Sequence, residues 1–171
     1  MAPVTILILR GDGNFTLCLS TSKAIMTLAD KLGRANFLAE EERQFTGGCD
    51  CGGVQFAVHG GLTDLTGCHC TQCQKTHGNF ALYSRAKKGS VELVHATGLK
   101  WYNSSEIARR GFCNQCGASI FFDRHEAEHI AIAAGMLDQP TGLKVSRHIY
   151  GATAADYFPV PEDCLSTGEP D

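Results

Sequence analysis

Three cysteines crowd into the six residues 68–73, whose sequence is CHCTQC. Thiols this close along the chain do not close unstrained disulfides, because a disulfide requires a suitable Cα separation and suitable Cβ directions. In an extended segment Cys68 and Cys70 point to one side and His69 to the other, and Cys73 returns on the following turn. The pattern favours a zinc site with three protein ligands over buried or incidental thiols. Such a site keeps a fourth position open for water or substrate, as in a catalytic zinc site.

Two further cysteine pairs flank this stretch, Cys49 with Cys51 before it and Cys113 with Cys116 after it, and a glycine follows each pair. A loop that wraps backbone N–H groups around thiolates needs a residue that tolerates a positive φ, which glycine does without steric cost. The middle stretch is followed by Gln74 and lacks this feature. We therefore assign the four flanking cysteines to one closed structural zinc and the middle three to a separate open site. The alternative is a single zinc that takes four of the seven thiols.

The composition of the chain limits the classes of function that it can have. The chain of 171 residues fits one domain of ordinary size with an appendage. Its net charge of −3 argues against a nucleic-acid-binding surface, so small molecules are the expected partners. Nine cysteines without a convincing signal peptide before them indicate a reducing compartment, and we expect a cytoplasmic protein. No apolar run approaches the roughly 20 residues that a membrane helix needs.

Short strands are the elements that must position these cysteines. From Gln44 onward, short apolar or alternating runs are separated by turn residues such as glycine, asparagine and serine. The candidate strands are residues 54–58, 80–83, 91–94, 99–102, 108–112, 120–122, 130–134 and 148–150. Their spacing predicts a mainly β domain built from antiparallel sheets.

The first 43 residues have a different pattern. Apolar residues at helical spacing predict a short amphipathic helix over residues 25–32, and a second helical patch follows over residues 35–43. We see no set of metal ligands or catalytic groups in this segment. The sequence therefore predicts an N-terminal extension over residues 1–43, a zinc-binding domain over residues 44–165 and a tail over residues 166–171.

Taken together, these motifs resemble the glutathione-dependent formaldehyde-activating enzyme family, to which centromere protein V also belongs. The matching motifs are GGCxCG at 47–52, CHCxxCxK at 68–75, YxSS at 102–105, RxFCxxCG at 110–117 and GxLDxP at 135–140. The resemblance covers residues 44 to about 160. This chain is similar to the short, bacterial-type members rather than to the longer founding enzyme.

The resemblance implies a β-tent fold of antiparallel sheets held by a structural zinc, and two zinc ions per chain. It places the structural ion on Cys49, Cys51, Cys113 and Cys116, and the catalytic ion on Cys68, Cys70 and Cys73. The implied activity is that of a zinc-dependent carbon–sulfur lyase similar to S-(hydroxymethyl)glutathione synthase, which joins formaldehyde and glutathione reversibly. The alternative is a zinc-stabilised binding module without catalysis, a role that centromere protein V shows to be open to this scaffold.

This chemistry requires a proton donor, because a thiolate that adds to an aldehyde leaves a negative charge on oxygen. His69, His77 and Tyr83 lie close to the three cysteines in sequence and are the candidates, although a single histidine is more often a surface or packed core residue.

The two carboxylates of glutathione would also attract cations. The candidates near the motifs are Lys75, Arg85, Lys87 and Arg110, of which we interpret Arg85 and Lys87 as ordinary solvated charges.

Overall fold

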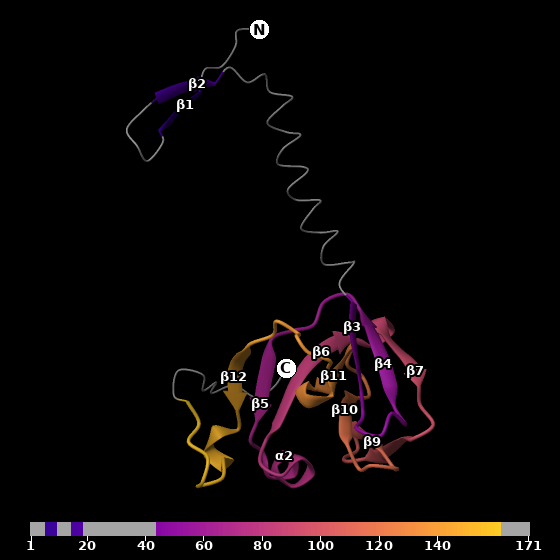
Figure 1. The fold of residues 1–171 in the computed structure, drawn as a ribbon. Coiled ribbons are helices and arrows are strands. Elements are labelled where there is room, and N and C mark those ends of the chain that lie inside the picture. Colours follow the sequence, from indigo (N-terminus) through magenta and orange to yellow (C-terminus); the bar gives the residue numbers. More distant parts are fainter. Residues whose placement is uncertain (1–5, 10–14, 19–43, 162–171) are drawn as a thin grey trace. The chain divides into compact units, whose positions relative to one another are not determined.

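The chain divides into two compact units, Met1–Glu42 and Arg43–Asp171. The computed structural model, shown as a ribbon in Figure 1, describes residues 6–9, 15–18 and 44–161. The two units are described separately below.

In the first unit the described residues form two antiparallel strands, β1 (Ile6–Leu9) and β2 (Phe15–Cys18). The sequence pattern did not predict this pairing. The helices expected over residues 25–32 and 35–43, and the tail expected over residues 166–171, lie outside the described residues.

The second unit is built on a seven-stranded sheet with the order β12-β5-β6-β11-β10-β9-β8. In that order, its strands are Val145–Ile149, Leu65–Cys68, Ala81–Lys87, His129–Ala133, Ser119–Arg124, Ala108–Cys113 and Leu99–Asn103. Neighbouring strands are antiparallel except β12 and β5, which run parallel. The expectation of a mainly β fold is confirmed, and this one parallel pair makes the sheet mixed rather than purely antiparallel.

A three-stranded antiparallel sheet with the order β3-β4-β7 packs against the larger one, and its strands are Gln44–Gly48, Gln55–His59 and Val91–His95. The α-helix of the described residues is α2 (Thr71–His77), and three 3₁₀ turns are η1 (Lys88–Ser90), η2 (Ala134–Met136) and η3 (Gly151–Thr153). The assignment of elements from sequence misses the strands β3 and β5 and the helix α2, each of which contains a cysteine or directly precedes one. In the part of the chain that the structure describes, no helix has the length and apolar character needed to cross a membrane.

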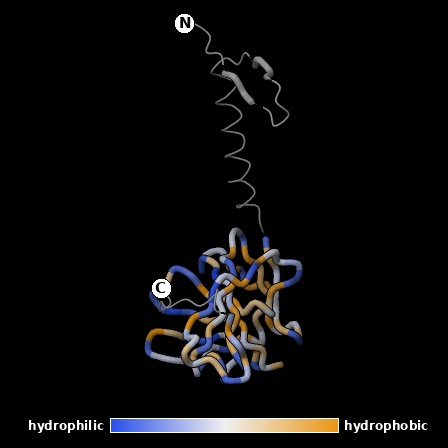
Figure 2. The backbone as a smooth tube through the Cα atoms, turned by 90° about the vertical axis from the view of Figure 1, so that its left-hand side faces the viewer, coloured by the Kyte–Doolittle hydropathy of each residue, from blue (hydrophilic) through white to orange (hydrophobic). Residues whose placement is uncertain are grey.

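The two faces of the larger sheet have different roles, and the alternation of residues along each strand separates them. On β10, Phe121 is buried in the core between the two sheets, whereas its neighbour Phe122 faces the other way and lines a cavity. On β11, Ile132 and Ala131 divide in the same manner. Figure 2 shows hydrophobic and hydrophilic stretches alternating along the chain of this unit. One face of the sheet therefore stabilises the fold, and the other is available for a site.

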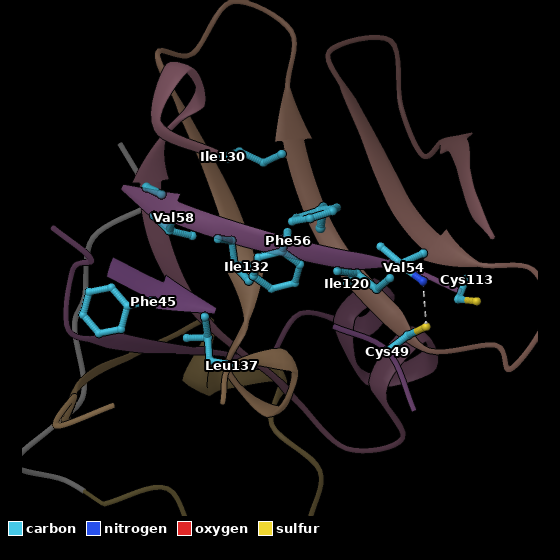
Figure 3. Packing of buried hydrophobic residues seen from close by; sticks show 12 residues of the cluster. Phe45, Cys49, Val54, Phe56, Val58, Cys113, Ile120, Ile130, Ile132 and Leu137 are labelled. Carbon is cyan, nitrogen blue, oxygen red and sulfur yellow. Dashed lines mark hydrogen bonds between the residues drawn. The ribbon is translucent and has the colours of Figure 1, made fainter. Parts of the chain in front are cut away.

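Phe56 of β4 and Phe121 of β10 make the central contact of the core, with ring centroids 5.3 Å apart. Val54, Val58 and Ile132 pack around them, and all five side chains are buried (Figure 3). Because these residues come from both sheets, this cluster joins the sheets into one body.

We predict that Phe56→Ala lowers the free energy of unfolding by about 3 to 5 kcal/mol, because it removes a buried ring and leaves a cavity. Chemical denaturation of the metal-loaded protein measures this loss. The control is Val94→Ala on β7, where the side chain is 62% exposed, and it should shift stability by less than about 0.5 kcal/mol. Equal losses in the two variants would contradict the assignment of the core.

Candidate metal centres

Four cysteines from two distant parts of the chain meet at one end of the core. Their sulfur atoms all lie within 4.8 Å of one another, and the residues are Cys49, Cys51, Cys113 and Cys116. Figure 3 shows the first and third of these beside Val54, whose backbone N–H donates a hydrogen bond of 3.2 Å to Cys49 Sγ. We call this group the four-thiol cluster. It connects the loop after β3 to the end of β9.

Glycines shape both halves of the four-thiol cluster. Gly52 and Gly117 have φ angles of 74° and 79°, in the left-handed region where glycine is favoured. The N–H of Gly52 bonds to the carbonyl of Cys49, and the N–H of Gly117 bonds to that of Cys113. The glycines that follow the cysteine pairs in sequence therefore close the turns that direct the thiols inward.

The other three cysteines form a second group, the three-thiol cluster. Cys68 ends β5, Cys70 is the N-cap of α2 and Cys73 lies in its first turn, with the three sulfur atoms within 4.8 Å of one another. The backbone N–H of Cys73 donates to Cys70 Sγ over 3.4 Å. Because residues three apart share a face of a helix, α2 directs the last two thiols toward the first.

The donor chemistry of both clusters fits a metal ion. All seven cysteines are free thiols, so none is used in a disulfide. Sulfur atoms this close repel one another once ionised, and a cation is the ordinary means of holding them together. The two clusters can each hold a metal ion, and thiolate ligands are compatible with zinc.

A cavity of about 670 Å³ opens beside the three-thiol cluster. Its floor is the outer face of the seven-stranded sheet, and its walls include Cys68, Cys70 and Cys73. No member of the four-thiol cluster lines it. The two clusters thus differ in their surroundings. The three-thiol cluster faces a space large enough for small reactants, whereas Cys51 and Cys116 of the four-thiol cluster are exposed at the surface outside this cavity.

A hydrogen-bonded chain of side chains lies beside the three-thiol cluster. Arg110 donates to the hydroxyl oxygen of Tyr83 over 3.2 Å, and its other terminal nitrogen lies 3.7 Å from Cys73 Sγ. His77 Nε2 is 2.8 Å from the same hydroxyl and 3.3 Å from the hydroxyl of Ser119. Tyr83 and Arg110 line the cavity, whereas His77 lines a smaller hollow formed with Phe80 and Met136. The contact between Tyr83 and His77 therefore connects a residue of the cavity wall with a residue of the smaller hollow.

The surroundings of these groups shift their acidity. A hydrogen bond with Cys68 and the charge of Arg110 lower the pKa of Cys73 to about 6, although burial opposes the shift. Burial, assisted by the charge of Arg110, lowers the pKa of His77 to about 4, so this imidazole is neutral at pH 7. Burial raises the pKa of Tyr83, so its hydroxyl is protonated at pH 7.

His69, the remaining candidate proton donor, lies elsewhere. Its side chain is fully buried, its Nε2 is 2.7 Å from His148 Nδ1, and its ring stacks on Phe80. It does not line the cavity. It follows the alternation of an extended segment, in which His69 points away from the two cysteines beside it.

The cation candidates from the sequence also divide into residues that line the cavity and residues that do not. Arg85 and Arg110 line the cavity, whereas Lys75 and Lys87 are exposed and do not. We interpret Arg85 from the sequence as an ordinary solvated charge, whereas the structure places it in the cavity wall. Two further arginines, Arg124 and Arg147, also line the cavity but were not among the candidates, although the first follows Phe122 at the spacing of two that keeps residues on one face of a strand.

The chain is similar in sequence to one known family and in fold to a solved structure. The sequence model of the family described as glutathione-dependent formaldehyde-activating enzyme matches residues 44–153. No curated protein matches the chain. Among solved structures, the crystal structure of a Rhodobacter sphaeroides protein is 24% identical in sequence, with a TM-score of 0.49, and the match covers 57% of this chain and 91% of that chain.

The two clusters should respond differently to the loss of one thiol. We predict that Cys113→Ser prevents folding or causes aggregation, because binding of a structural metal contributes on the order of 10 kcal/mol to folding. Cys70→Ser should fold, since its cluster lines the cavity and lies outside the core between the two sheets. Thermal unfolding and metal content per chain measure both effects. Comparable loss of thermal stability in the two variants would show that the division into a closed and an open centre is wrong.

Proposed function

Because this chain belongs to the glutathione-dependent formaldehyde-activating enzyme family, we propose that it is a zinc-dependent carbon–sulfur lyase acting on the adduct of a small thiol and a small aldehyde. Glutathione and formaldehyde are the reactants that the family description names. The observation that carries the proposal is the opening of three thiols onto a cavity of about 670 Å³. The proposed catalytic domain is residues 44–165, with residues 1–43 as an extension.

The two proposed zinc sites have different ligands. The catalytic ion is assigned to Cys68, Cys70 and Cys73, and the structural ion to Cys49, Cys51, Cys113 and Cys116. When bound by three thiolates, zinc supplies a Lewis acid that lowers the pKa of a substrate thiol, so that the thiol reacts as a thiolate at neutral pH. The four-thiol cluster has a full set of protein ligands and takes no part in the reaction.

The proposed reaction is a reversible addition. The thiolate sulfur forms a bond to the carbonyl carbon, the π electrons of the C=O bond move to oxygen, and that oxygen takes up one proton. In the reverse direction the hydroxyl oxygen loses its proton and the carbon–sulfur bond breaks. The protein must therefore hold the aldehyde oxygen near a group that gives and takes one proton.

We assign this role to Tyr83. Its hydroxyl stands at the cavity wall between Arg110 and His77. Arg110 donates to the phenolic oxygen and so stabilises the negative charge left when the proton moves to the aldehyde oxygen. His77 accepts from or donates to the same oxygen, and it reaches the second hollow, from which a proton can be returned.

Exchange NMR with carbon-13-labelled formaldehyde and glutathione tests the proposal, because it measures how fast carbon passes between free and thiol-bound forms. We expect the metal-loaded protein to accelerate this exchange above the rate in buffer, and Cys70→Ser to abolish the acceleration. Tyr83→Phe should reduce it by about 10²-fold or more, the usual contribution of a general acid or base.

The matched control is Lys75→Gln on the exposed side of α2, which should leave the rate unchanged. A full rate in Tyr83→Phe would remove that residue from the mechanism. A wild-type rate equal to that in buffer would favour the binding module instead.

A further inference from the structure

The cavity has a cationic region that the proposed chemistry does not use. Arg85 on β6, Arg124 on β10 and Arg147 on β12 all line it, and all three side chains are half-buried. Together with the buried Arg110, they place four guanidinium groups around one space. Glu128 is the one carboxylate among the described lining residues. The cavity therefore carries a net positive charge.

These three arginines have no carboxylate partner in the described part of the chain, where no acidic oxygen lies within 4.0 Å of their guanidinium nitrogens. Arg147 donates only to the hydroxyl of Thr66, over 3.2 Å. Arg109 behaves differently on the opposite face of β9, where it pairs with Asp123 over 2.8 Å and stacks 4.2 Å above the ring of Trp101. Arg109 is thus paired with a carboxylate inside the fold, whereas Arg85, Arg124 and Arg147 have charges that no described carboxylate neutralises.

The register of the sheet places these charges near the thiols. Cys68 is paired with Ile149, and two residues further along the strands Thr66 is paired with Arg147. Arg85 follows Tyr83 by two residues on β6. With a rise of about 3.3 Å per residue, one such step is roughly 7 Å. Arg147 thus stands one step along the strands from Cys68, within reach of a carboxylate close to the thiol. Arg85 stands two steps from Cys68, because Cys68 is paired with Ala81 on β6.

Arg124 extends this region on the far side of the cavity. Phe122 is paired with both Ala131 and Arg110, and Ala131 is paired with Arg85, so these residues form one row across the sheet. Arg124 stands two residues beyond Phe122, in the next row. The three arginines thus occupy successive positions, one to three steps along the strands from Cys68, on one surface of the cavity.

We propose that Arg85, Arg124 and Arg147 form a carboxylate-binding subsite that selects the thiol by its negative charge. The inference rests on the proposed function and deepens it. The cavity offers several groups for anions and one, Glu128, for a substrate ammonium group. Recognition therefore depends on carboxylates near the sulfur rather than on the whole glutathione peptide, and other dicarboxylate thiols are accepted as well. Arg147 stands one strand step from Cys68, and coenzyme A carries no anionic group this close to its thiol.

Binding of four thiols to the metal-loaded full chain, measured by calorimetry, tests this subsite. The probes are glutathione, glutathione diethyl ester, mercaptosuccinate and coenzyme A. We expect glutathione and mercaptosuccinate to bind at least about 10-fold more tightly than the ester, because each hydrogen bond between two charged groups adds affinity. Their affinity should also fall as salt is added, since screening weakens these contacts. Coenzyme A should bind no better than the ester.

The double variant Arg85→Gln/Arg124→Gln should weaken glutathione binding about 10-fold or more while leaving binding of the ester unchanged. The matched control is Lys87→Gln on the same strand, which does not line the cavity and should bind all four thiols as the wild type does. A melting temperature close to that of the wild type shows that the double variant is folded. If the melting temperature of the double variant falls sharply, Arg85→Lys and Arg85→Ala are compared instead. Arg85→Lys should bind glutathione more tightly than Arg85→Ala.

Two outcomes would overturn the subsite. One is equal affinity for glutathione and its ester in the wild type, and the other is tighter binding of coenzyme A than of mercaptosuccinate. Failure of the proposed function is a separate result, because it would appear as the absence of accelerated formaldehyde exchange with every thiol, whatever their order of affinity.

Discussion

The packing of four sulfur atoms within 4.8 Å of one another is the constraint on which the rest of the domain depends. The thiols come from the loop after β3 and from the end of β9, so their meeting joins the small sheet to the large one. Thiolates repel at such distances, and the buried Cys49 and Cys113 are also costly to desolvate when ionised, so a cation offsets both effects. The core around Phe56 and Phe121 extends from this cluster and packs the two sheets against each other.

Once the sheets are joined, one surface of the larger sheet is left without a covering sheet, and this surface holds the cavity. Successive side chains of a strand point to opposite faces of the sheet. Tyr83, Arg85 and Phe122 therefore line the cavity, while neighbouring residues of the same strands point toward the core. The three-thiol cluster closes one end, where α2 directs two of its thiols to the third. The proposed metal site, proton-transfer group and carboxylate subsite thereby lie along one sheet surface.

The division of the cysteines could be predicted from the sequence, because glycines follow only the pairs that turn tightly. Tyr83 could also be found, since it lies close to the cysteines in the chain. Arg124 and Arg147 could not, because their place in the cavity wall depends on a sheet register that joins distant strands, including the parallel pairing of β12 with β5. The helix α2 was missed because it is short and its sequence has no clear apolar periodicity.

The central claim is that the three-thiol cluster captures the substrate thiol as a thiolate. Calorimetry of glutathione and S-methylglutathione, each titrated in two buffers of different ionisation enthalpy, tests it most directly. Because a free thiol has a pKa of about 8.5 to 9, binding as thiolate at pH 7 should release close to one proton per glutathione bound. The thioether should release none and bind much more weakly. Equal affinity for the two ligands, with no proton released by either, would contradict the account.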